Sequence, residues 1–510
     1  MTNLSKFTKV SSFNSTFSGC SALQSVTLSA SGSSADAVDF TAAFLNCSKL
    51  TSIVNIEKFT NVNSFSNAFS ACPILESVTL CPEGSTVDND IEFNSAFYGC
   101  KALTSIANLD KYTKASNFSE TFRNCTALKD ITLPVPADAT KSITFQYAFS
   151  GCTALERVAN LDEYKNVSSL SYTFYQCSNL TYAMLGNVPS TTTGAFDDTN
   201  PNCLKYVPDG TDVSAFSTTW KNFIVGGKAT GDIELTDKDY YGDYYPFYCP
   251  QAFSMGDYTM TYKRTWTYAT KQGGWNTLCL PFAATAQKTD DYNYAYIDLT
   301  PAAAGKDGGY LLKTLAASTM PGEITLANAA TVEAYKPYLV ALPGDGFGSD
   351  ASLQGSSVRF VSAANATIEK TPDTQQPLEG SQYSMYGTLS DYQADNLYLL
   401  YNEKSGSTVT GSSFELYANG GVHPFRAYIK GNTSAAMSAP RLVIKGGDDG
   451  ATGIREASVG ASSTEIPAVS YVYSIDGRLL RTVPASEYEQ RLDGLDRGIY
   501  IVNGVKEVVR

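Results

Sequence analysis

The sequence predicts a mainly β protein in three parts: a solenoid of short repeats, an antiparallel β-sandwich of jelly-roll type, and a small C-terminal β-module. Three observations predict this class. The motif F-x-x-C-x-x-L occurs seven times within the first 180 residues. Short runs that alternate apolar and polar residues follow, as half-buried strands require. After a Gly/Ser-rich segment, Asp-Gly and Asn-Gly dipeptides punctuate further strand-like runs.

The repeat has a regular period. Its cysteines are spaced by 27, 25, 28, 25, 27 and 25 residues, and they are Cys20, Cys47, Cys72, Cys100, Cys125, Cys152 and Cys177. An eighth, degenerate copy centres on Cys203. A period of about 20 to 30 residues indicates one supersecondary unit per repeat, which buries its apolar side only against its neighbours. We therefore expect a solenoid over residues 1–226, with function on a stacked surface.

Each repeat carries one predicted parallel strand. Leu23, Val26 and Leu28 trace the L-x-x-[V/I]-x-L signature of a leucine-rich repeat, which recurs from Leu75 and from Leu128. The intervening copies read L-x-x-[I/V]-x-N-[I/L] and contain Asn55, Asn108 and Asn160. Two repeat types therefore alternate, which indicates duplication of a two-repeat block. With parallel strands ~4.8 Å apart, eight repeats would form a slab roughly 40 Å long.

The repeated cysteines are expected to be free thiols in the interior of this leucine-rich repeat solenoid. A free cysteine packs like a small hydrophobic residue, which suits a crowded inner column. The alternative is a ladder of disulfides or a metal-thiolate column. Bridging one pair of identical positions would leave others unpaired, and the chain has 11 cysteines, an odd number. We expect no bound metal and no cofactor.

The repeat motif resembles the BspA-type leucine-rich repeat. The resemblance rests on A-F-x-x-C-x-x-L-x-x-[I/V], seen at Ala96, Phe97, Cys100, Leu103 and Ile106, and it covers roughly residues 5–208. It implies a bacterial surface or secreted protein that adheres to host proteins or to other cells, and it carries no catalytic motif. Because the chain begins inside a repeat, without an N-terminal cap, we expect a truncated or processed product.

Composition narrows the class of partner. The chain has 510 residues and a formal net charge of -13, which opposes binding to phosphate backbones, so nucleic acid is not expected as a partner. No stretch of 18 apolar residues occurs, so we expect no transmembrane span. Only 17% of the residues are charged, while tyrosine reaches 33. This profile favours an extracellular or outer cell-surface location.

A β-sandwich is expected over residues 227–446. Met260, Tyr262 and Arg264 fall on one face of a predicted strand with Trp266 and Tyr268, because alternate side chains of a strand point the same way. Nine more short runs follow this pattern between residues 276 and 445, and no convincing amphipathic helix interrupts them. Ten candidate strands favour an antiparallel sandwich, with a jelly roll as one form of it.

A Gly/Ser-rich linker over residues 447–468 leads to a C-terminal β-module over residues 469–510. The dipeptides Asp476-Gly477 and Asn503-Gly504 suit hairpin turns. The module resembles the C-terminal sorting domains of type IX secretion in Bacteroidetes-type bacteria. The matching residues are Tyr473, Asp476, Gly477, Arg478, Gly498, Ile499, Tyr500, Ile501 and Lys506. This resemblance implies a cell-surface or secreted location.

No catalytic site is expected. His423 is the single histidine, so any Ser-His-Asp or Cys-His arrangement would have to use it, and its place between turn glycines and a strand favours a turn or packing role. One histidine also excludes the usual zinc arrangements. Acidic pairs occur at Asp290-Asp291 and Asp448-Asp449, and their sequence context favours a solvated turn and a solvated linker.

A candidate contact patch lies on the outward strand positions of the later repeats. The second outward column reads Ser in the first four repeats, then Asp130, Arg157 and Tyr182. Tyrosine and arginine are common at binding hot spots. The candidate ligand-binding residues are Lys129, Asp130, Glu156, Arg157 and Tyr182. The alternative is a face that is merely soluble.

Three functions follow from these features. The leading hypothesis is a non-enzymatic, cell-surface or secreted bacterial binding or adhesion protein, whose repeat face contacts an extracellular or host protein. The first alternative is a carbohydrate-binding protein that acts through the β-sandwich. Six aromatic residues between positions 240 and 248 could stack on a glycan or fasten the solenoid to the sandwich. The second alternative is a carboxylate-based glycan hydrolase.

Overall fold

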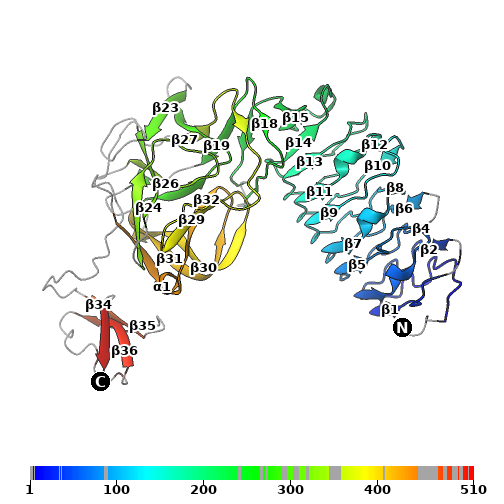
Figure 1. The fold of residues 1–510 in the computed structure, drawn as a ribbon, viewed down its shortest axis with the longest axis horizontal. Coiled ribbons are helices and arrows are strands. Elements are labelled where there is room, and N and C mark those ends of the chain that lie inside the picture. Colours follow the sequence, from blue (N-terminus) through cyan, green and yellow to red (C-terminus); the bar gives the residue numbers. More distant parts are fainter. Residues whose placement is uncertain are drawn as a thin grey trace.

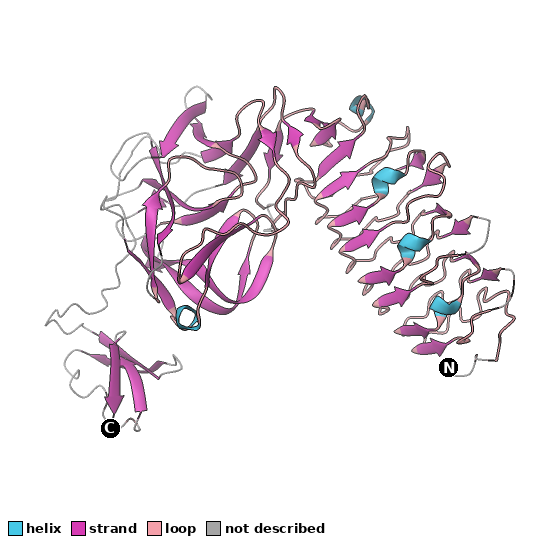
Figure 2. Cartoon of the chain, viewed as in Figure 1, coloured by secondary structure: helices cyan, strands magenta, loops and turns pink. Residues whose placement is uncertain are grey.

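The protein is built almost entirely from short strands, arranged as a solenoid, a larger β region and a separate C-terminal sheet (Figure 1 and Figure 2). The computed structural model describes residues 4, 6–33, 35, 37–85, 90–238, 243–264, 268–269, 274–289, 296–301, 309–317, 321–343, 358–405, 408–445, 469–474, 479–484, 492, 495, 498–502 and 505–509. The predicted mainly β fold class, with an N-terminal repeat solenoid, is confirmed.

Two columns of parallel strands form the sides of the solenoid. The first column consists of β1 (Ser25–Thr27), β3 (Ser52–Val54), β5 (Ser77–Thr79), β7 (Ser105–Ala107), β9 (Asp130–Thr132), β11 (Arg157–Ala159), β13 (Tyr182–Met184), β14 (Leu204–Val207) and β15 (Phe223–Val225). The second consists of β2 (Val38–Asp39), β4 (Val62–Ser64), β6 (Ile91–Glu92), β8 (Ala115–Asn117), β10 (Ile143–Thr144) and β12 (Val167–Ser169). Equivalent residues of successive repeats pair in register, for example Val26 with Ile53, so the predicted outward columns exist.

The motif cysteines form a file along the solenoid interior. Each thiol from the second repeat onward donates a hydrogen bond to the carbonyl of the motif phenylalanine one repeat earlier. The bonds are Cys47 to Phe17 (3.0 Å), Cys72 to Phe44 (3.2 Å), Cys100 to Phe69 (3.1 Å), Cys125 to Phe97 (3.1 Å), Cys152 to Phe122 (2.9 Å) and Cys177 to Phe149 (3.1 Å). All 11 cysteines are free, so the expectation of interior thiols is confirmed for these six.

Cys20 departs from the expectation, because its side chain is exposed. It belongs to the first copy of the motif, and no described repeat stacks on its outer side. The buried thiols differ from it chemically. Burial raises the pKa of the Cys100 and Cys152 thiols to about 12 and raises that of Cys125 well above its ordinary value.

Two ladders of stacked phenylalanine rings run beside the cysteine file. One ladder joins Phe17, Phe44, Phe69, Phe97, Phe122, Phe149, Phe174 and Phe196, with ring centroids 5.2 to 5.9 Å apart. The other joins Phe13, Phe40, Phe65, Phe93, Phe118 and Phe145, at 4.9 to 6.0 Å. These separations lie in the favourable range for aromatic pairs. Each ring therefore contacts the next repeat as well as its own.

An asparagine explains why two repeat types alternate. Asn55, Asn108 and Asn160 adopt left-handed backbone conformations, with φ of 69°, 66° and 65°, and each precedes a single 3-10 turn. The turns are η1 (Ile56–Lys58), η2 (Leu109–Lys111) and η3 (Leu161–Glu163). The side-chain amide of Asn108 donates to the carbonyl of Leu80 in the preceding repeat at 2.8 Å, and the other two asparagines do the same. The asparagine thus ties two repeats into one block.

The solenoid continues into the second β region through one shared sheet. Its strand order is β13-β14-β15, then β16 (Lys228–Ala229), β18 (Phe253–Ser254) and β28 (Thr367–Ile368), with the 3-10 turn η4 (Val213–Ala215) before β15. In β14, Leu204 and Tyr206 belong to the core of the second region, whereas Val207 belongs to the core of the solenoid. Hydrogen bonding therefore crosses the boundary predicted at residue 226.

Lys205 occupies an unexpected position in the degenerate eighth repeat. It pairs in register with Ala183, at the column position that holds Val or Ile in earlier repeats, and its side chain is buried. Its ammonium group donates to the carbonyls of Cys203 and Lys221, both at 3.1 Å. It also lies over the ring of Phe196 at 5.1 Å. Burial lowers the pKa of Lys205. A cation thus closes the end of the phenylalanine ladder.

The second region, residues 227–445, consists mainly of one large mixed sheet around two main cores, with a smaller cluster of Leu397, Val422 and Tyr428. Its elements are β17 (Ile233–Leu235), β19 (Met260–Arg264), β20 (Tyr268–Ala269), β21 (Asn276–Cys279), β22 (Thr285–Thr289), β23 (Tyr296–Pro301), β24 (Gly309–Ala317), β25 (Glu323–Asn328), β26 (Pro337–Pro343), β27 (Val358–Val361), β29 (Tyr383–Thr388), β30 (Tyr392–Ser405), β31 (Thr408–Val422), β32 (Arg426–Gly431), α1 (Ser434–Met437) and β33 (Arg441–Lys445). Most strand pairs are antiparallel, and β17–β19, β20–β26, β23–β24 and β25–β33 are parallel.

Strand β26 is shared by the two cores. Tyr338 and Val340 point into one core, while Leu339 and Ala341 point into the other. A strand that is buried on both faces reads as a continuous apolar run instead of an alternating one. This burial explains the nearly continuous apolar sequence of β26, PYLVALP. Strands β22, β24 and β25 were not among the predicted strands, and Trp266 lies outside the described residues.

The C-terminal part forms its own antiparallel sheet, in the order β35-β34-β36-β37. The strands are β34 (Val469–Ser474), β35 (Leu479–Pro484), β36 (Gly498–Val502) and β37 (Val505–Val509). Hairpin pairing joins β34 to β35 and β36 to β37, which agrees with the two predicted turns. The turn residues themselves lie outside the described residues. No helix within the described ranges is long and apolar enough to cross a membrane.

We predict that Asn108→Ala destabilises the protein more than Asn108→Gly does. Both variants lose the hydrogen bond to Leu80, at a cost of about 1 kcal/mol. Alanine also adds about 1–2 kcal/mol because its Cβ opposes the left-handed conformation, which glycine adopts freely. Urea unfolding of both variants measures the difference. Equal stabilities would contradict the role assigned to the left-handed backbone.

We also predict that a maleimide modifies Cys20 alone in the folded protein near neutral pH. The other ten thiols are buried, and they should react only after denaturation. Mass spectrometry of peptides from the labelled protein locates the adducts. Cys20→Ser is the control and should remove labelling of the folded chain. Labelling of Cys125 as fast as Cys20 would contradict the closed interior.

Candidate functional site

A hollow lies where the strand face of the solenoid meets the second region. We call it the elbow hollow, and its volume is about 510 Å³. Its solenoid wall consists of Lys129, Ala154, Glu156, Arg157, Asn179 and Thr181. Its other wall comes mainly from three segments of the second region, at residues 246–248, 371–376 and 387–391. Three of the five predicted contact residues, Lys129, Glu156 and Arg157, therefore share one concave site.

The remaining two predicted residues position the wall instead of lining the hollow. The guanidinium of Arg157 donates from Nε to Asp130 at 2.7 Å, across the paired strands β9 and β11. Tyr182 stacks on Tyr248 of the second region, with ring centroids 5.8 Å apart. Because both partners of the Arg157 ion pair are about half exposed, the pair orients the guanidinium but adds little stability.

Glu156 is the carboxylate with a perturbed environment in this wall. Burial raises its pKa, the charge of Asp130 raises it further, and the cations of Lys129 and Arg157 oppose the shift. Its backbone carbonyl accepts hydrogen bonds from the amide and the hydroxyl of Thr181, which holds the start of β11 against β13. The wall thus presents both signs of charge on a rigid backbone.

The opposite wall supplies rings and polar side chains. Pro246, Tyr248 and Pro372 lie there with Asp373 and Gln375. Among the described residues, no group of three or more His, Cys, Asp or Glu side chains could hold a metal ion. The arrangement can accept hydrogen bonds, donate them and contact apolar surface, which is the chemistry of a recognition site.

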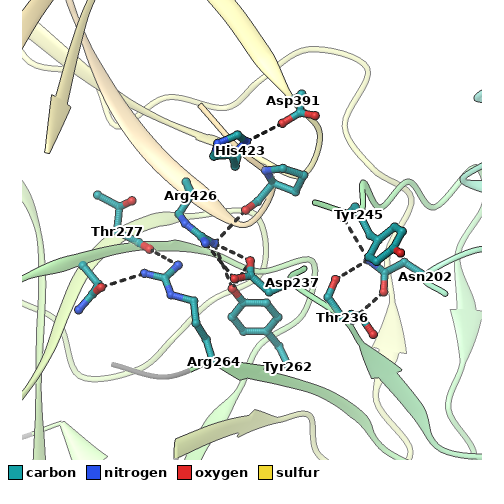
Figure 3. Close-up of polar contacts among 12 residues, drawn as sticks. Asn202, Thr236, Asp237, Tyr245, Tyr262, Arg264, Thr277, Asp391, His423 and Arg426 are labelled. Carbon is teal, nitrogen blue, oxygen red and sulfur yellow. Dashed lines mark hydrogen bonds and ion pairs between the residues drawn. The ribbon is translucent and has the colours of Figure 1, made fainter. Parts of the chain in front are cut away.

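A buried ion pair behind the elbow anchors the second region (Figure 3). Asp237 follows β17 and receives two hydrogen bonds from Arg426 of β32, at 2.7 and 2.9 Å. The hydroxyl of Tyr262 also donates to Asp237, at 3.1 Å. Burial alone would raise the pKa of Asp237, yet the hydrogen bonds and charge of Arg426 hold it below the ordinary value of 3.8. Sequence reasoning missed this pair because its members are 189 residues apart.

Asn202 connects this network to the solenoid. Its side-chain amide donates to the carbonyls of Thr236 and Tyr245, and its oxygen accepts from the amide of Thr236 at 2.7 Å. Asn202 is fully buried in the last turns of the solenoid. Thr236 immediately precedes Asp237, so the same short segment contacts both parts of the molecule (Figure 3).

The single histidine has two described neighbours. His423 contacts Asp391 through Nδ1 at 3.0 Å and stacks on Tyr244, with ring centroids 3.7 Å apart. No contact between His423 and a serine, threonine or cysteine hydroxyl or thiol is recorded in the part of the chain that the structure describes. These contacts match the packing role expected for it from the sequence.

The other residues singled out in the sequence fall in different places. Tyr240 and Tyr241, and the acidic pairs Asp290-Asp291 and Asp448-Asp449, lie outside the described residues. Phe247 is buried in the core of the second region, and Trp275 is buried in its other core. The aromatic segment before the sandwich therefore contributes to packing through Phe247 and to the elbow through Tyr248.

Comparison with known proteins identifies the repeats. Residues 2–95 and 90–217 match the family described as BspA type Leucine rich repeat region, in 6 copies. The resemblance stated for the repeats is thereby supported over the solenoid. No curated protein and no solved structure matches the chain.

We predict that Asp237→Asn destabilises the protein by about 3–5 kcal/mol at pH 7, because it leaves the Arg426 cation buried without its carboxylate. The pKa of Asp237 is lowered in the folded state. The ionised carboxylate therefore stabilises the fold fully above the unfolded pKa of about 3.9. This stabilisation is lost as the pH falls through the pKa of the folded state. The difference in unfolding free energy between wild type and variant should therefore shrink below about pH 4. Denaturant unfolding at pH 7 and pH 3 measures it, and a pH-independent difference would contradict the assignment.

Proposed function

We propose that this chain is a non-catalytic binding protein that holds an extracellular protein on the strand face of its solenoid, beside the elbow hollow. The observation that carries this proposal is the convergence of Lys129, Glu156 and Arg157 with the wall at residues 246–248 in one concave site. The repeat family is associated with adhesion and binding, which supports the same class of function.

The shape of the face favours a large partner over a small molecule. Strands β1, β3, β5 and β7 carry short outward side chains, including serine at four successive positions of one column. Short side chains let another surface approach the strands closely. The elbow then supplies the charged and aromatic groups that are enriched at hot spots. Contact would extend from the hollow along the earlier repeats.

We propose a cell-surface or secreted location as part of this function. Proteins with BspA-type repeats are commonly found there, and the described ranges contain no helix that could span a membrane. The C-terminal sheet of β34 to β37 is proposed to serve as the export or sorting module that its sequence resembles. Val472 of β34 and Val483 of β35 form a small core of its own with Leu492 and Leu495, as such a module would require.

The proposed function predicts that reversing one charge in the elbow hollow weakens capture of the partner. Immobilised full-length protein is exposed to purified extracellular matrix proteins and mucin, and bound proteins are quantified. Lys129→Glu is expected to weaken the binding of whichever protein wild type retains by about tenfold or more, as a hot-spot change does. Arg157→Ala should weaken the same interaction.

Lys49→Glu is the matched control, since it makes the same charge change at an exposed lysine of an early repeat that does not line the hollow. It should retain binding within about twofold, a difference below the 1.4 kcal/mol of a tenfold change. Circular dichroism confirms that all three variants fold. Equal loss in Lys49→Glu and Lys129→Glu would show that net charge, not the hollow, governs capture.

A further inference from the structure

A second site lies in the β region, around the two partly buried arginines of Figure 3. Arg264 and Arg426 both line a hollow of about 500 Å³ on one side and a hollow of about 250 Å³ on the other. We call this pair of adjoining hollows the arginine cleft. It is distinct from the elbow hollow, because neither arginine lines that site.

The described residues that line the larger hollow carry more positive than negative groups. Asp237 is held by Arg426, while Arg264 donates to the carbonyl of Thr277 and to the side-chain oxygen of Asn276, both at 3.2 Å. The larger hollow is also lined by Lys238 and Lys263, against Glu234 as the one further carboxylate of that lining. Among the described residues of that lining, four cations face two carboxylates. Burial of Arg264 in this setting favours the approach of an anion.

Two donors in the cleft have no partner. The indole Nε1 of Trp275 and the amide Nδ2 of Asn276 are buried and make no hydrogen bond. Trp275 is fully buried, and both residues line the smaller hollow beside Arg264. Buried tryptophan N–H groups usually have an acceptor, and a buried polar group without one requires an explanation. An acceptor-rich ligand in the hollow would provide it.

An aromatic surface connects the two hollows. Tyr244 lines the larger hollow and His423 lines the smaller one, and their rings stack with centroids 3.7 Å apart. The His423 side chain is 54% exposed. Amphipathic rings of this kind suit the apolar face of a sugar, whereas a bare inorganic anion would gain nothing from them.

We propose that the arginine cleft binds the carboxylate of an acidic saccharide. The carboxylate lies against Arg264 and accepts hydrogen bonds from Trp275 and Asn276, while a neighbouring sugar ring lies on the His423 ring, whose other face stacks on Tyr244. The site is separate from the protein-binding face of the solenoid. The protein would thus recognise a protein and an acidic glycan at two different places.

The test compares galacturonic acid disaccharide with its methyl ester, by isothermal titration calorimetry on the full chain. The ester removes the negative charge and adds one methyl group per carboxyl, so wild type should bind the acid about tenfold or more tightly, as expected for hydrogen bonds to a charged group. Inorganic sulfate is the third probe. Equal binding of acid and ester would overturn the anion site, and sulfate binding as tight as the acid would overturn the saccharide part of the proposal.

Asn276→Asp is the decisive variant. It keeps the acceptor that holds Arg264, removes the unpartnered donor and adds a negative charge where the ligand carboxylate would lie, so the fold is expected to persist. Its affinity for the acid should fall about tenfold or more. Trp275→Phe, which removes a donor from a retained aromatic ring, should also weaken binding.

The matched control is Thr314→Val, which removes another buried, unpartnered polar atom that does not line either hollow. It should bind the acid as wild type does. Arg157→Ala in the elbow hollow should likewise leave this binding unchanged, which separates the two sites. Wild-type affinity in Asn276→Asp would overturn the proposal.

Discussion

The axial contact between successive repeats is the constraint on which the rest of this structure depends. Each buried thiol reaches the phenylalanine carbonyl of the preceding repeat, and each phenylalanine stacks on its counterpart. These contacts succeed only if every repeat places the same groups at the same depth and height. A larger side chain at the cysteine would separate the rings, and a smaller one would leave the carbonyl without its donor. The regular strand face on the outside is a consequence of this regular interior.

The regular pattern of the repeats changes at the C-terminal end of the solenoid, beside the elbow hollow. In β14 the outward column residues Leu204 and Tyr206 are buried in the second region, while inward Lys205 replaces the usual aliphatic residue. The strand face is therefore covered at its C-terminal end and remains open over the earlier repeats. A concave corner results, and the charged members of the outward column, Arg157 and Asp130, stand beside it.

Buried charge distinguishes the second region from the solenoid. In a chain of formal net charge -13, two arginines line one cleft, where the carboxylate of Asp237 accepts two hydrogen bonds from Arg426. Buried ions are costly unless they are paired and hydrogen-bonded, so such an arrangement persists where it fixes structure or meets a ligand. Asp237 fixes structure, since Thr236 and Asn202 connect it to the solenoid. The unpartnered donors of Trp275 and Asn276 indicate a place for a ligand.

The sequence decided the periodic features of this protein. Each repeat packs against a neighbour with the same sequence pattern, so one local pattern specifies both sides of the contact. The interior cysteines, the in-register columns and the alternation marked by Asn55, Asn108 and Asn160 all belong to this class, as do the C-terminal hairpins, whose turns are local. Only the tertiary structure could decide what joins distant segments. It brought Arg157 to face residues 246–248, paired Asp237 with Arg426 across 189 residues, and buried β26 on both faces. No short-range pattern encodes such contacts, since their energies depend on burial and on partners that the fold alone supplies.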